Sequence, residues 1–321
     1  MIDDPVLVDD WHVVSWSQDL AEGEIKRARV LGEDLVLWRQ DGQVMVWQDL
    51  CVHRGSRLSL GKVTEGCLQC PYHGWTYDTS GRCVKMPAHP DQTPPTKAVV
   101  KTYRAQECYG MIWVTLGSPA HDVPPFPEWE QASFRKVACG PYTVHASGPR
   151  AIENFLDVAH FPFVHEGYLG DQAHTEIADY QVVTNEAGVK AENIHVWQPD
   201  PDGTGEGKDV VYTYHVFRPL TAYFVKEAKA SFSILFNVTP VDPVESIGWM
   251  WVAMNYGLDM PPESVSGFQD KIFSQDLPIV ENQRPELLPL DLQAELHLRS
   301  DKTAIAYRQW LMELGLSFGA S

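Results

Sequence analysis

The sequence CVHRGSRLSLG at 51–61 and the sequence CPYHGWTYDTSGRC at 70–83 each begin with a cysteine that is closely followed by a histidine. The two pairs are Cys51 with His53, and Cys70 with His73. Glycine soon follows each histidine, and glycine favours tight turns. Such turns on two neighbouring loops would bring two thiolates and two imidazoles together. We therefore expect these residues to hold a metal group.

Two metal groups use this set of ligands. Structural zinc accepts two cysteines and two histidines in a tetrahedral site. A 2Fe–2S cluster of the Rieske type has two cysteines on one iron and two histidines on the other. Zinc sites usually pair like ligands locally, whereas each short pair here mixes one cysteine with one histidine. The mixed pairs favour the cluster, in which each loop gives one ligand to each iron, and zinc is the alternative.

The other cysteines are expected to have ordinary roles. Cys67 lies three residues before Cys70 and imitates a Cys-x-x-Cys pair, but four ligands already complete the cluster. Cys83, Cys108 and Cys139 are expected to be small buried hydrophobic residues. Six cysteines and an N-terminus without a secretory signal favour reduced thiols, so we expect a cytoplasmic protein.

Length, composition and charge exclude some classes of protein. A chain of 321 residues suggests about two domains, and 44% hydrophobic residues are enough for a folded core. The net charge of −18 argues against binding to nucleic acid or to an anionic membrane surface. No apolar run approaches the roughly 20 residues that a membrane-spanning helix needs.

The first part of the chain has the pattern of β structure. Residues 34–50 alternate apolar and polar side chains around Asp41-Gly42, which predicts a hairpin. Residues 109–117 predict another strand, and the proline-rich residues 118–130 suit neither a helix nor a central strand. The expected organisation is a first domain at 1–120, a proline-rich linker at 121–140 and a second domain at 141–321.

The second domain is expected to combine strands and helices. A short helical pattern covers about 150–160. Strands are expected at 210–217, 221–240 and 248–256, and helices at about 264–283 and 301–314, with Asp301 as a possible cap. Most of the aromatic residues on these strands are expected to pack in the core, and Arg218, Tyr223 and Asn237 are candidates for contact with a ligand.

A second group of chemically active residues lies in ENFLDVAHFPFVH at 153–165, and consists of Asn154, Asp157, His160 and His165. Steps of three residues would place the first three on one side of a helix. Phe161-Pro162 disfavours continuation of that helix, and a turn there would let His165 approach His160. Two imidazoles beside a carboxylate are typical of a mononuclear Fe(II) site. The alternative is a pair of structural core histidines.

The third ligand is expected in the sequence QDKIFSQDLPIVENQ at 269–283. Asp276 falls in line with the apolar residues Phe268, Ile272, Ile279 and Val280. A carboxylate on such a face is costly to bury unless it is paired or bound to metal. Asp270 and Glu281 lie off that stripe and are expected in solvent. Asp276 is therefore the expected ligand.

The residues that flank both cysteine–histidine pairs match the Rieske motif, so the chain resembles the oxygenase component (alpha subunit) of Rieske non-haem iron oxygenases. The narrower likeness is to short single-subunit-type enzymes, such as saxitoxin-tailoring hydroxylases and purine N-demethylases. It is carried by PAHPDQTPP at 87–95, HFPFVHEGYLGD at 160–171 and SDKTAIAYRQWLMELGLSFG at 300–319.

This resemblance implies an α+β chain. An N-terminal all-β Rieske domain would precede a helix-grip (START-like) catalytic domain, in which an antiparallel sheet wraps a long C-terminal helix. The resemblance implies a Rieske 2Fe–2S cluster on the first four ligands and mononuclear non-haem Fe(II) on His160, His165 and Asp276. Asp157 resembles the aspartate that bridges two metal sites, and Asn154 is a second candidate catalytic residue.

The implied activity is reductive activation of O2 to hydroxylate a small organic substrate. The alternatives are oxidative N- or O-demethylation and aromatic-ring dioxygenation within the same family, and, from other classes, a non-catalytic 2Fe–2S electron carrier or a zinc-stabilised binding protein. No G-x-G-x-x-G segment opens a helix, so an NAD(P)H-dependent reductase or a ferredoxin would supply electrons. The family also implies a head-to-tail homotrimer, in which Asp157 bridges His73 of one chain and His160 of the next.

Overall fold

The computed structural model describes residues 4–227 and 230–321. The chain divides into two compact units, Met1–Val123 (unit 1) and Pro124–Ser321 (unit 2). The expected linker at 121–140 is too long, because strand β11 begins at Arg135. Arg135 to Cys139 pair with Met254 to Met250 of strand β17, so backbone pairing draws this stretch into the sheet of unit 2.

Unit 1 is built from β strands, as expected. Its described residues form a six-stranded antiparallel sheet in the order β1 (His12–Trp16), β10 (Met111–Thr115), β9 (Thr102–Cys108), β4 (Gln43–Gln48), β3 (Glu33–Gln40) and β2 (Ile25–Val30). A smaller sheet consists of β5 (Lys62–Thr64), β6 (Cys67–Gln69), β7 (Thr76–Tyr77) and β8 (Cys83–Lys85). One-turn helices lie at α1 (Pro5–Val8), η1 (Ser17–Asp19) and η2 (Leu58–Leu60).

The hairpin predicted around Asp41-Gly42 is confirmed. Gln40 pairs with Gln43 across the turn, and both turn residues have positive φ, 53° for Asp41 and 74° for Gly42. Positive φ at both central residues defines the type I′ turn, whose twist matches that of the flanking strands. This hairpin places Trp38 beside Trp47 in the core, with their ring centroids 5.0 Å apart.

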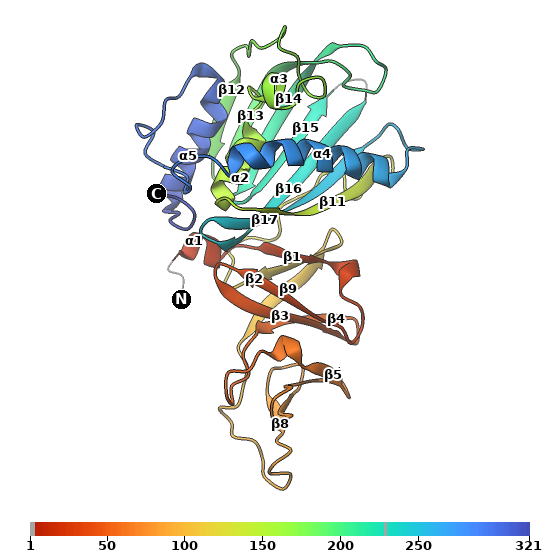
Figure 1. The fold of residues 1–321 in the computed structure, drawn as a ribbon, viewed down its shortest axis with the longest axis vertical. Coiled ribbons are helices and arrows are strands. Elements are labelled where there is room, and N and C mark those ends of the chain that lie inside the picture. Colours follow the sequence, from red (N-terminus) through yellow and green to blue (C-terminus); the bar gives the residue numbers. More distant parts are fainter. Residues whose placement is uncertain (1–3, 228–229) are drawn as a thin grey trace. The chain divides into compact units, whose positions relative to one another are not determined.

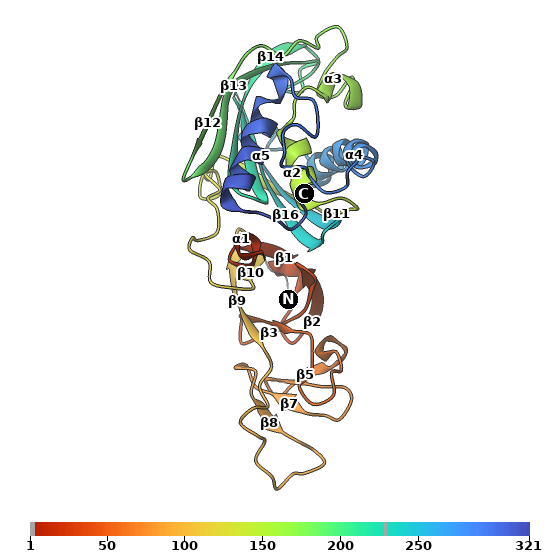
Figure 2. The ribbon, with the colours of Figure 1, turned by 90° about the vertical axis from the view of Figure 1, so that its left-hand side faces the viewer.

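Unit 2 is a curved antiparallel sheet that packs around helices. The strand order among its described residues is β11 (Arg135–Val144), β17 (Glu245–Met254), β16 (Ser231–Asp242), β15 (Thr221–Glu227), β14 (Lys208–Arg218), β13 (Gly188–Gln198) and β12 (Gln181–Asn185). The helices are α2 (Gly148–Leu156), α3 (Phe161–Val164), α4 (Pro262–Val280), η3 (Arg299–Asp301) and α5 (Lys302–Leu314). The long α4 crosses the strands (Figure 1), and the sheet curves around α2, α4 and α5 (Figure 2).

The α+β fold class is therefore confirmed, but three local expectations need correction. The strand expected at 221–240 is two strands, and its residues 228–229 lie outside the described part. The helix expected at 150–160 ends at Leu156. Asp301 precedes α5, but its carboxylate accepts the Leu298 amide at 2.7 Å and makes no cap bond to α5, because the preceding turn η3 uses it.

Helix α2 is anchored by buried ion pairs, which matters because it leads directly to the expected metal ligands. Arg308 of α5 donates to both oxygens of Glu153, at 2.5 and 2.8 Å. Arg150 of α2 and Arg308 both donate to Glu295. Paired charges of this kind satisfy one another where water is excluded. The network ties α2, α5 and the segment around residue 295 into one rigid support.

No helix in the described part of the chain is long and apolar enough to cross a membrane.

Candidate metal centres and active site

The two cysteine–histidine loops of unit 1 have the same backbone design. The Cys51 amide donates to the Ser56 carbonyl at 2.8 Å, and the Cys70 amide donates to the Trp75 carbonyl at 2.8 Å. Each loop is also closed from the other side, because Gly55 and Gly74 donate to the carbonyls of their cysteines. Both glycines have a φ of 68°, which only glycine adopts readily. The spacing in the sequence thus produces two matching loops.

The four expected cluster ligands come together on these loops. Cys51 and Cys70 are buried, with 2% exposure each, whereas His73 is exposed and His53 is half-buried. The ring centroids of His53 and His73 lie 4.6 Å apart, and His53 stacks on Trp75 at 4.4 Å. Two buried thiols beneath two outward imidazoles match the ligand set of a Rieske cluster.

Two observations support a metal at this place. Among the described residues, no group hydrogen-bonds to the buried Nδ1 of His53, so this ring nitrogen is available as a ligand. Burial raises the pKa of the Cys70 thiol, so this thiol would stay protonated unless a metal bound it. The Tyr77 hydroxyl lies 3.1 Å from Cys51 Sγ, where it can hydrogen-bond to a thiolate.

The remaining cysteines partly follow expectation. All six cysteines lie in the described part of the chain, and all are free thiols. Cys83 and Cys139 are buried, as predicted. Cys108 is only half-buried, because it ends β9 next to the turn at Tyr109-Gly110.

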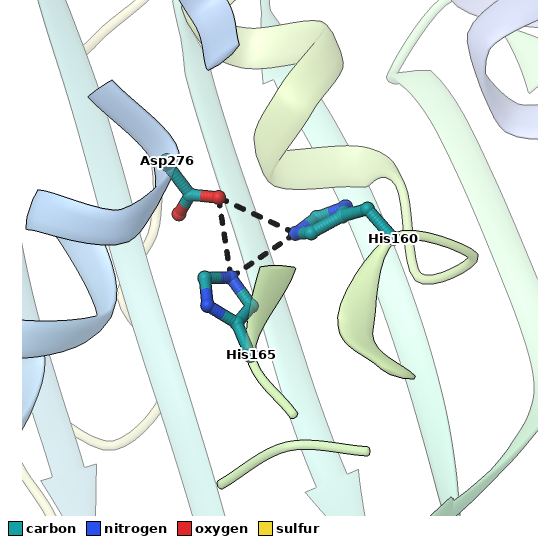
Figure 3. Close-up of side chains that lie close together, drawn as sticks. All are labelled: His160, His165 and Asp276. Atoms are coloured by element: carbon teal, nitrogen blue, oxygen red, sulfur yellow. Dashed lines mark hydrogen bonds and ion pairs between the residues drawn. The ribbon is translucent and has the colours of Figure 1, made fainter. Parts of the chain in front are cut away.

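In unit 2, the structure brings His160, His165 and Asp276 together (Figure 3). The two Nε2 atoms are 3.1 Å apart, and Asp276 Oδ1 lies 3.4 Å from Nε2 of His160 and 3.1 Å from Nε2 of His165. Ligand atoms about 2.1 Å from one metal ion, at right angles to one another, lie about 3 Å apart. The three distances therefore fit a two-His, one-carboxylate site.

The surroundings of the three ligands also fit a metal. Asp276 Oδ1 is buried, and no donor among the described residues hydrogen-bonds to it. Burial lowers the pKa of His165, but the neighbouring Asp276 carboxylate outweighs burial and raises it above its ordinary value. The carboxylate therefore favours positive charge at His165 Nε2, and a metal cation provides such charge as well as a proton does.

Asp157 orients His160 through a local turn, not through a helix face as expected. Its carboxylate accepts the amides of Ala159 and His160 at 3.0 and 3.1 Å, and this competition with the helix ends α2. The same carboxylate lies 2.8 Å from His160 Nδ1. Burial opposes ionisation of Asp157, yet the hydrogen bond from His160 and the backbone amides hold its pKa below the ordinary value.

The approach of His165 to His160 also has a local cause that differs from the expectation. Pro162 does not break a helix but opens the one-turn helix α3, where its missing N–H costs nothing. His160 precedes that turn and His165 follows it. The Val164 and His165 amides donate to the carbonyls of His160 and Phe161, which closes the turn between the two ligands.

Gln275 is a functional candidate that the sequence reasoning missed. Its Oε1 lies 2.9 Å from Nδ1 of His165, on the side of the ring that faces away from Asp276. It thereby fixes the ring in the orientation that presents Nε2 to a metal, as Asp157 does for His160. Its position directly before Asp276 in α4 was the available signal.

Helix α4 presents Asp276 on its buried face, although that face is not the predicted stripe. Phe268 and Ile279 are 39% and 48% exposed. The buried residues are Val265, Gln269, Ile272 and Val280, and their spacing of three and four residues includes position 276. Asp270 is exposed as expected, where it accepts the Tyr142 hydroxyl at 2.7 Å.

A cavity of about 680 Å³ adjoins the three ligands. Asn154, the second candidate catalytic residue, lines it, together with aromatic side chains from three strands: Tyr212, Tyr214, Phe224, Phe232 and Phe236. Cavities of this size bind small organic molecules.

None of Arg218, Tyr223 and Asn237 lines this cavity. On strand β15 the inward residues are Ala222, Phe224 and Lys226, so Tyr223 points to the opposite face, where it donates to Glu128 at 2.6 Å. Asn237 donates to Thr221 at 2.8 Å within the sheet.

Comparison with known proteins identifies the class. Residues 10–104 match the family described as Rieske [2Fe-2S] domain, and residues 144–316 match the Vanillate O-demethylase oxygenase C-terminal domain. The second match covers more than half of the chain, so the chain belongs to the Rieske oxygenases of this family. It is an oxidoreductase whose cofactors are a Rieske 2Fe–2S cluster and mononuclear non-haem iron.

Among individual proteins, the chain is 32% identical over 317 residues to Methylxanthine N1-demethylase NdmA of Pseudomonas putida, which covers 95% of this chain and 88% of that protein. A shorter match, 43% identical over 114 residues, relates 35% of this chain to 19% of Oxidoreductase NdmD of Pseudomonas putida. The structure of Pseudomonas putida CBB5 NdmA with caffeine superimposes with a TM-score of 0.81 at 28% identity, covering 96% of this chain and 91% of that one.

Proposed function

We propose that this oxygenase removes a methyl group from nitrogen or oxygen of a planar aromatic substrate by oxidising the methyl carbon. The observation that carries the proposal is the cavity, which is walled by aromatic rings and adjoins His160, His165 and Asp276. Flat rings stack favourably on such walls. The similarity to a methylxanthine N-demethylase supports the same conclusion.

We propose ligands for both metal groups from the positions of the side chains. Cys51, His53, Cys70 and His73 would hold the 2Fe–2S cluster. His160, His165 and Asp276 would hold the mononuclear iron. One support is that the ligand atoms of His160, His165 and Asp276 converge. Another is that two of the proposed ligand atoms, His53 Nδ1 and Asp276 Oδ1, are buried and have no hydrogen-bond partner among the described residues.

When bound, the two metal groups would supply electron transfer and activation of O2. In one turnover, the methylated substrate, O2, two electrons and two protons give the demethylated ring, formaldehyde and water. The chain's own residues position the reactants. Asp157 and Gln275 hold the two imidazoles, and the apolar walls orient the ring and exclude water from the oxidised carbon.

We propose that electrons come from an NAD(P)H-dependent reductase or a ferredoxin.

We also propose that the enzyme is a cytoplasmic head-to-tail homotrimer. In that assembly Asp157 would bridge His160 of its own chain and His73 of the next. The support is the partly exposed Asp157 side chain, 33% of which remains accessible while it bonds His160. Sedimentation of the holoenzyme should give about three times the 36.2 kDa chain mass, and a monomer would contradict the trimer.

Metal and sulfide analysis tests the ligand assignment. Three irons and two acid-labile sulfides per chain are expected, with a rhombic EPR signal after reduction by dithionite. Two irons and two sulfides would instead identify an electron carrier without a mononuclear site. Zinc without sulfide would identify a binding protein.

Product analysis tests the reaction. Methylated aromatic substrates should release formaldehyde in proportion to the O2 consumed. Hydroxylation is the second candidate, because both reactions begin by attack on a C–H bond in the same cavity. A hydroxylated product that keeps its methyl group would favour hydroxylation. A cis-dihydrodiol would indicate ring dioxygenation.

A further inference from the structure

A buried lysine lies in the wall of the substrate cavity. Lys226, near the end of strand β15, is only 9% exposed and lines the cavity that contains the iron ligands. Its ammonium donates to the Gln198 side chain at 3.3 Å and to the Pro201 carbonyl at 2.9 Å. It also lies 5.3 Å from the centroid of the Phe232 ring. The reaction proposed above gives this lysine no role.

Among the residues whose side chains the structure describes, no carboxylate lies within ion-pair distance of Lys226. The two nearby acids have other bonds: Asp202 accepts Lys208 Nζ at 2.7 Å, and Asp200 accepts the Gly205 amide at 2.9 Å. Burial lowers the pKa of Lys226 to about 8, although both acids act to raise it. An ammonium has three N–H donors, and protein acceptors at hydrogen-bond distance account for two. The third remains for a ligand.

Lys226 is linked to the iron ligands along one wall of the cavity. Gln198 donates to the Tyr212 hydroxyl at 2.9 Å, and the Tyr212 ring lies 6.2 Å from Phe161. Phe161 in turn contacts His160, with ring centroids 4.9 Å apart. A planar molecule in this cavity can therefore lie along Tyr212, with one end at the iron ligands and the other at the lysine.

We propose that Lys226, supported by Gln198, binds an anionic oxygen on the substrate, at the end of the ring system remote from the carbon that is oxidised. The proposal rests on the function proposed above and adds to it the substrate class, an aromatic acid. A buried ammonium with no carboxylate at ion-pair distance is stabilised when a carboxylate or a deprotonated ring oxygen enters beside it. Such a contact would also orient the ring, because it fixes the end opposite the methyl group.

A structural role for Lys226 is the competing explanation. Its bond to Pro201 could serve only to hold the loop between β13 and β14 against the sheet. Such a role makes no distinction between charged and neutral ligands. The test therefore compares ligands that differ in charge but share a ring.

The test is calorimetric binding to the oxidised holoenzyme at pH 7, which requires no electron transfer. One pair of probes is 4-methoxybenzoate and its methyl ester, and the other is a methylurate anion and the neutral methylxanthine. The first pair tests a carboxylate and the second a deprotonated ring oxygen. Wild type should prefer the anion in at least one pair by about tenfold or more. An absence of any preference for an anion, including an absence of binding, would overturn the proposal.

Two variants then test whether Lys226 causes the preference for the anion. Lys226→Met should weaken binding of the preferred anion by about 10- to 100-fold and change binding of its neutral partner by less than about threefold. Lys190→Met is the matched control, because Lys190 lies on the same sheet in β13, pairs with Glu192 and does not line the cavity. Equal losses in both variants, or equal losses for the anion and its neutral partner, would contradict the proposal. Iron and sulfide contents of the same samples test the oxygenase assignment separately.

Discussion

The Nε2 atoms of His160 and His165 lie 3.1 Å apart across the single turn of α3, while the Nδ1 atoms of the two rings are held by Asp157 and Gln275. Each ring therefore has one nitrogen held by a neighbouring side chain, and the proposed ligand assignment gives the other nitrogen to the metal. Asp276 of α4 completes the site from a different element. The arrangement separates proposed ligand residues from positioning residues, so substitutions in the two groups should have different effects.

Asp276→Ala should remove the mononuclear iron and leave the cluster in place. Iron per chain should fall from three to two while sulfide stays at two, and turnover should be lost. Asp270→Ala is the matched control, because Asp270 is an exposed carboxylate on the same helix and lies outside the group of ligands. Iron content that is unchanged in Asp276→Ala would show that another residue holds the metal.

Gln275→Leu should loosen the iron without removing it, because Leu cannot accept the hydrogen bond of the His165 ring. Loss of such an outer partner typically lowers metal affinity 10- to 100-fold, roughly the effect expected here in a chelator competition. Gln275→Glu should retain the iron, since a carboxylate accepts the same bond. If the Leu variant and wild type lost iron to the chelator equally, Gln275 would have no role in holding the metal.

Cys70→Ala should abolish the 2Fe–2S absorbance and destabilise unit 1, because the binding energy of a metal site contributes to folding. Cys67→Ala is its control: that thiol is three residues away in β6 and is half-buried, yet it is not an expected ligand. A cluster that survives in Cys70→Ala, or disappears in Cys67→Ala, would overturn the assignment of ligands.

Lys226 should make stability depend on pH in an alkaline window. Its pKa is lowered to about 8 in the folded chain, so the unfolded chain binds more protons between pH 8 and its ordinary value of about 10.5. Stability therefore rises with pH across that window. Relative to Lys226→Met, wild type should gain about 3 kcal/mol between pH 7 and pH 10.5.

Denaturant unfolding of both proteins at several pH values measures this difference in the free energy of unfolding. Contributions from titratable groups that the two proteins share cancel in the difference. The titratable groups around the lysine are Asp200, Asp202, Tyr212 and Tyr256, which both proteins retain. A difference that stays flat with pH would mean that the ammonium is not desolvated.

The metal-binding loops were predictable because their determinants are local. Each cysteine–histidine pair lies within one loop, and the glycines that close the loops are adjacent in sequence. The approach of His165 to His160 was predictable for the same reason. Asp276 was identifiable because it lies four residues from both Ile272 and Val280, which are buried, and a carboxylate in line with buried apolar residues needs a partner.

The substrate-facing residues were not predictable, because they depend on register. Residues 222–225 are all apolar or aromatic, so alternation does not reveal which side chains face the cavity. Pairing of Tyr212 with Lys226 across β14 and β15 decides that Phe224 and Lys226 point inward and Tyr223 outward. The end of α2 at Leu156 was missed because the Asp157 carboxylate competes for the backbone amides that a longer helix would use.

The most direct test of the whole account is a single turnover of pre-reduced holoenzyme mixed with O2 and a methylated aromatic acid, with cluster reoxidation and formaldehyde followed together. Wild type should reoxidise its cluster at the rate at which formaldehyde appears. Asp157→Asn should keep both metals but slow the two processes by orders of magnitude, because the charge that orients His160 is lost. Reoxidation of the wild-type cluster without any oxidised product, or reoxidation at the wild-type rate in Asp157→Asn, would contradict the account.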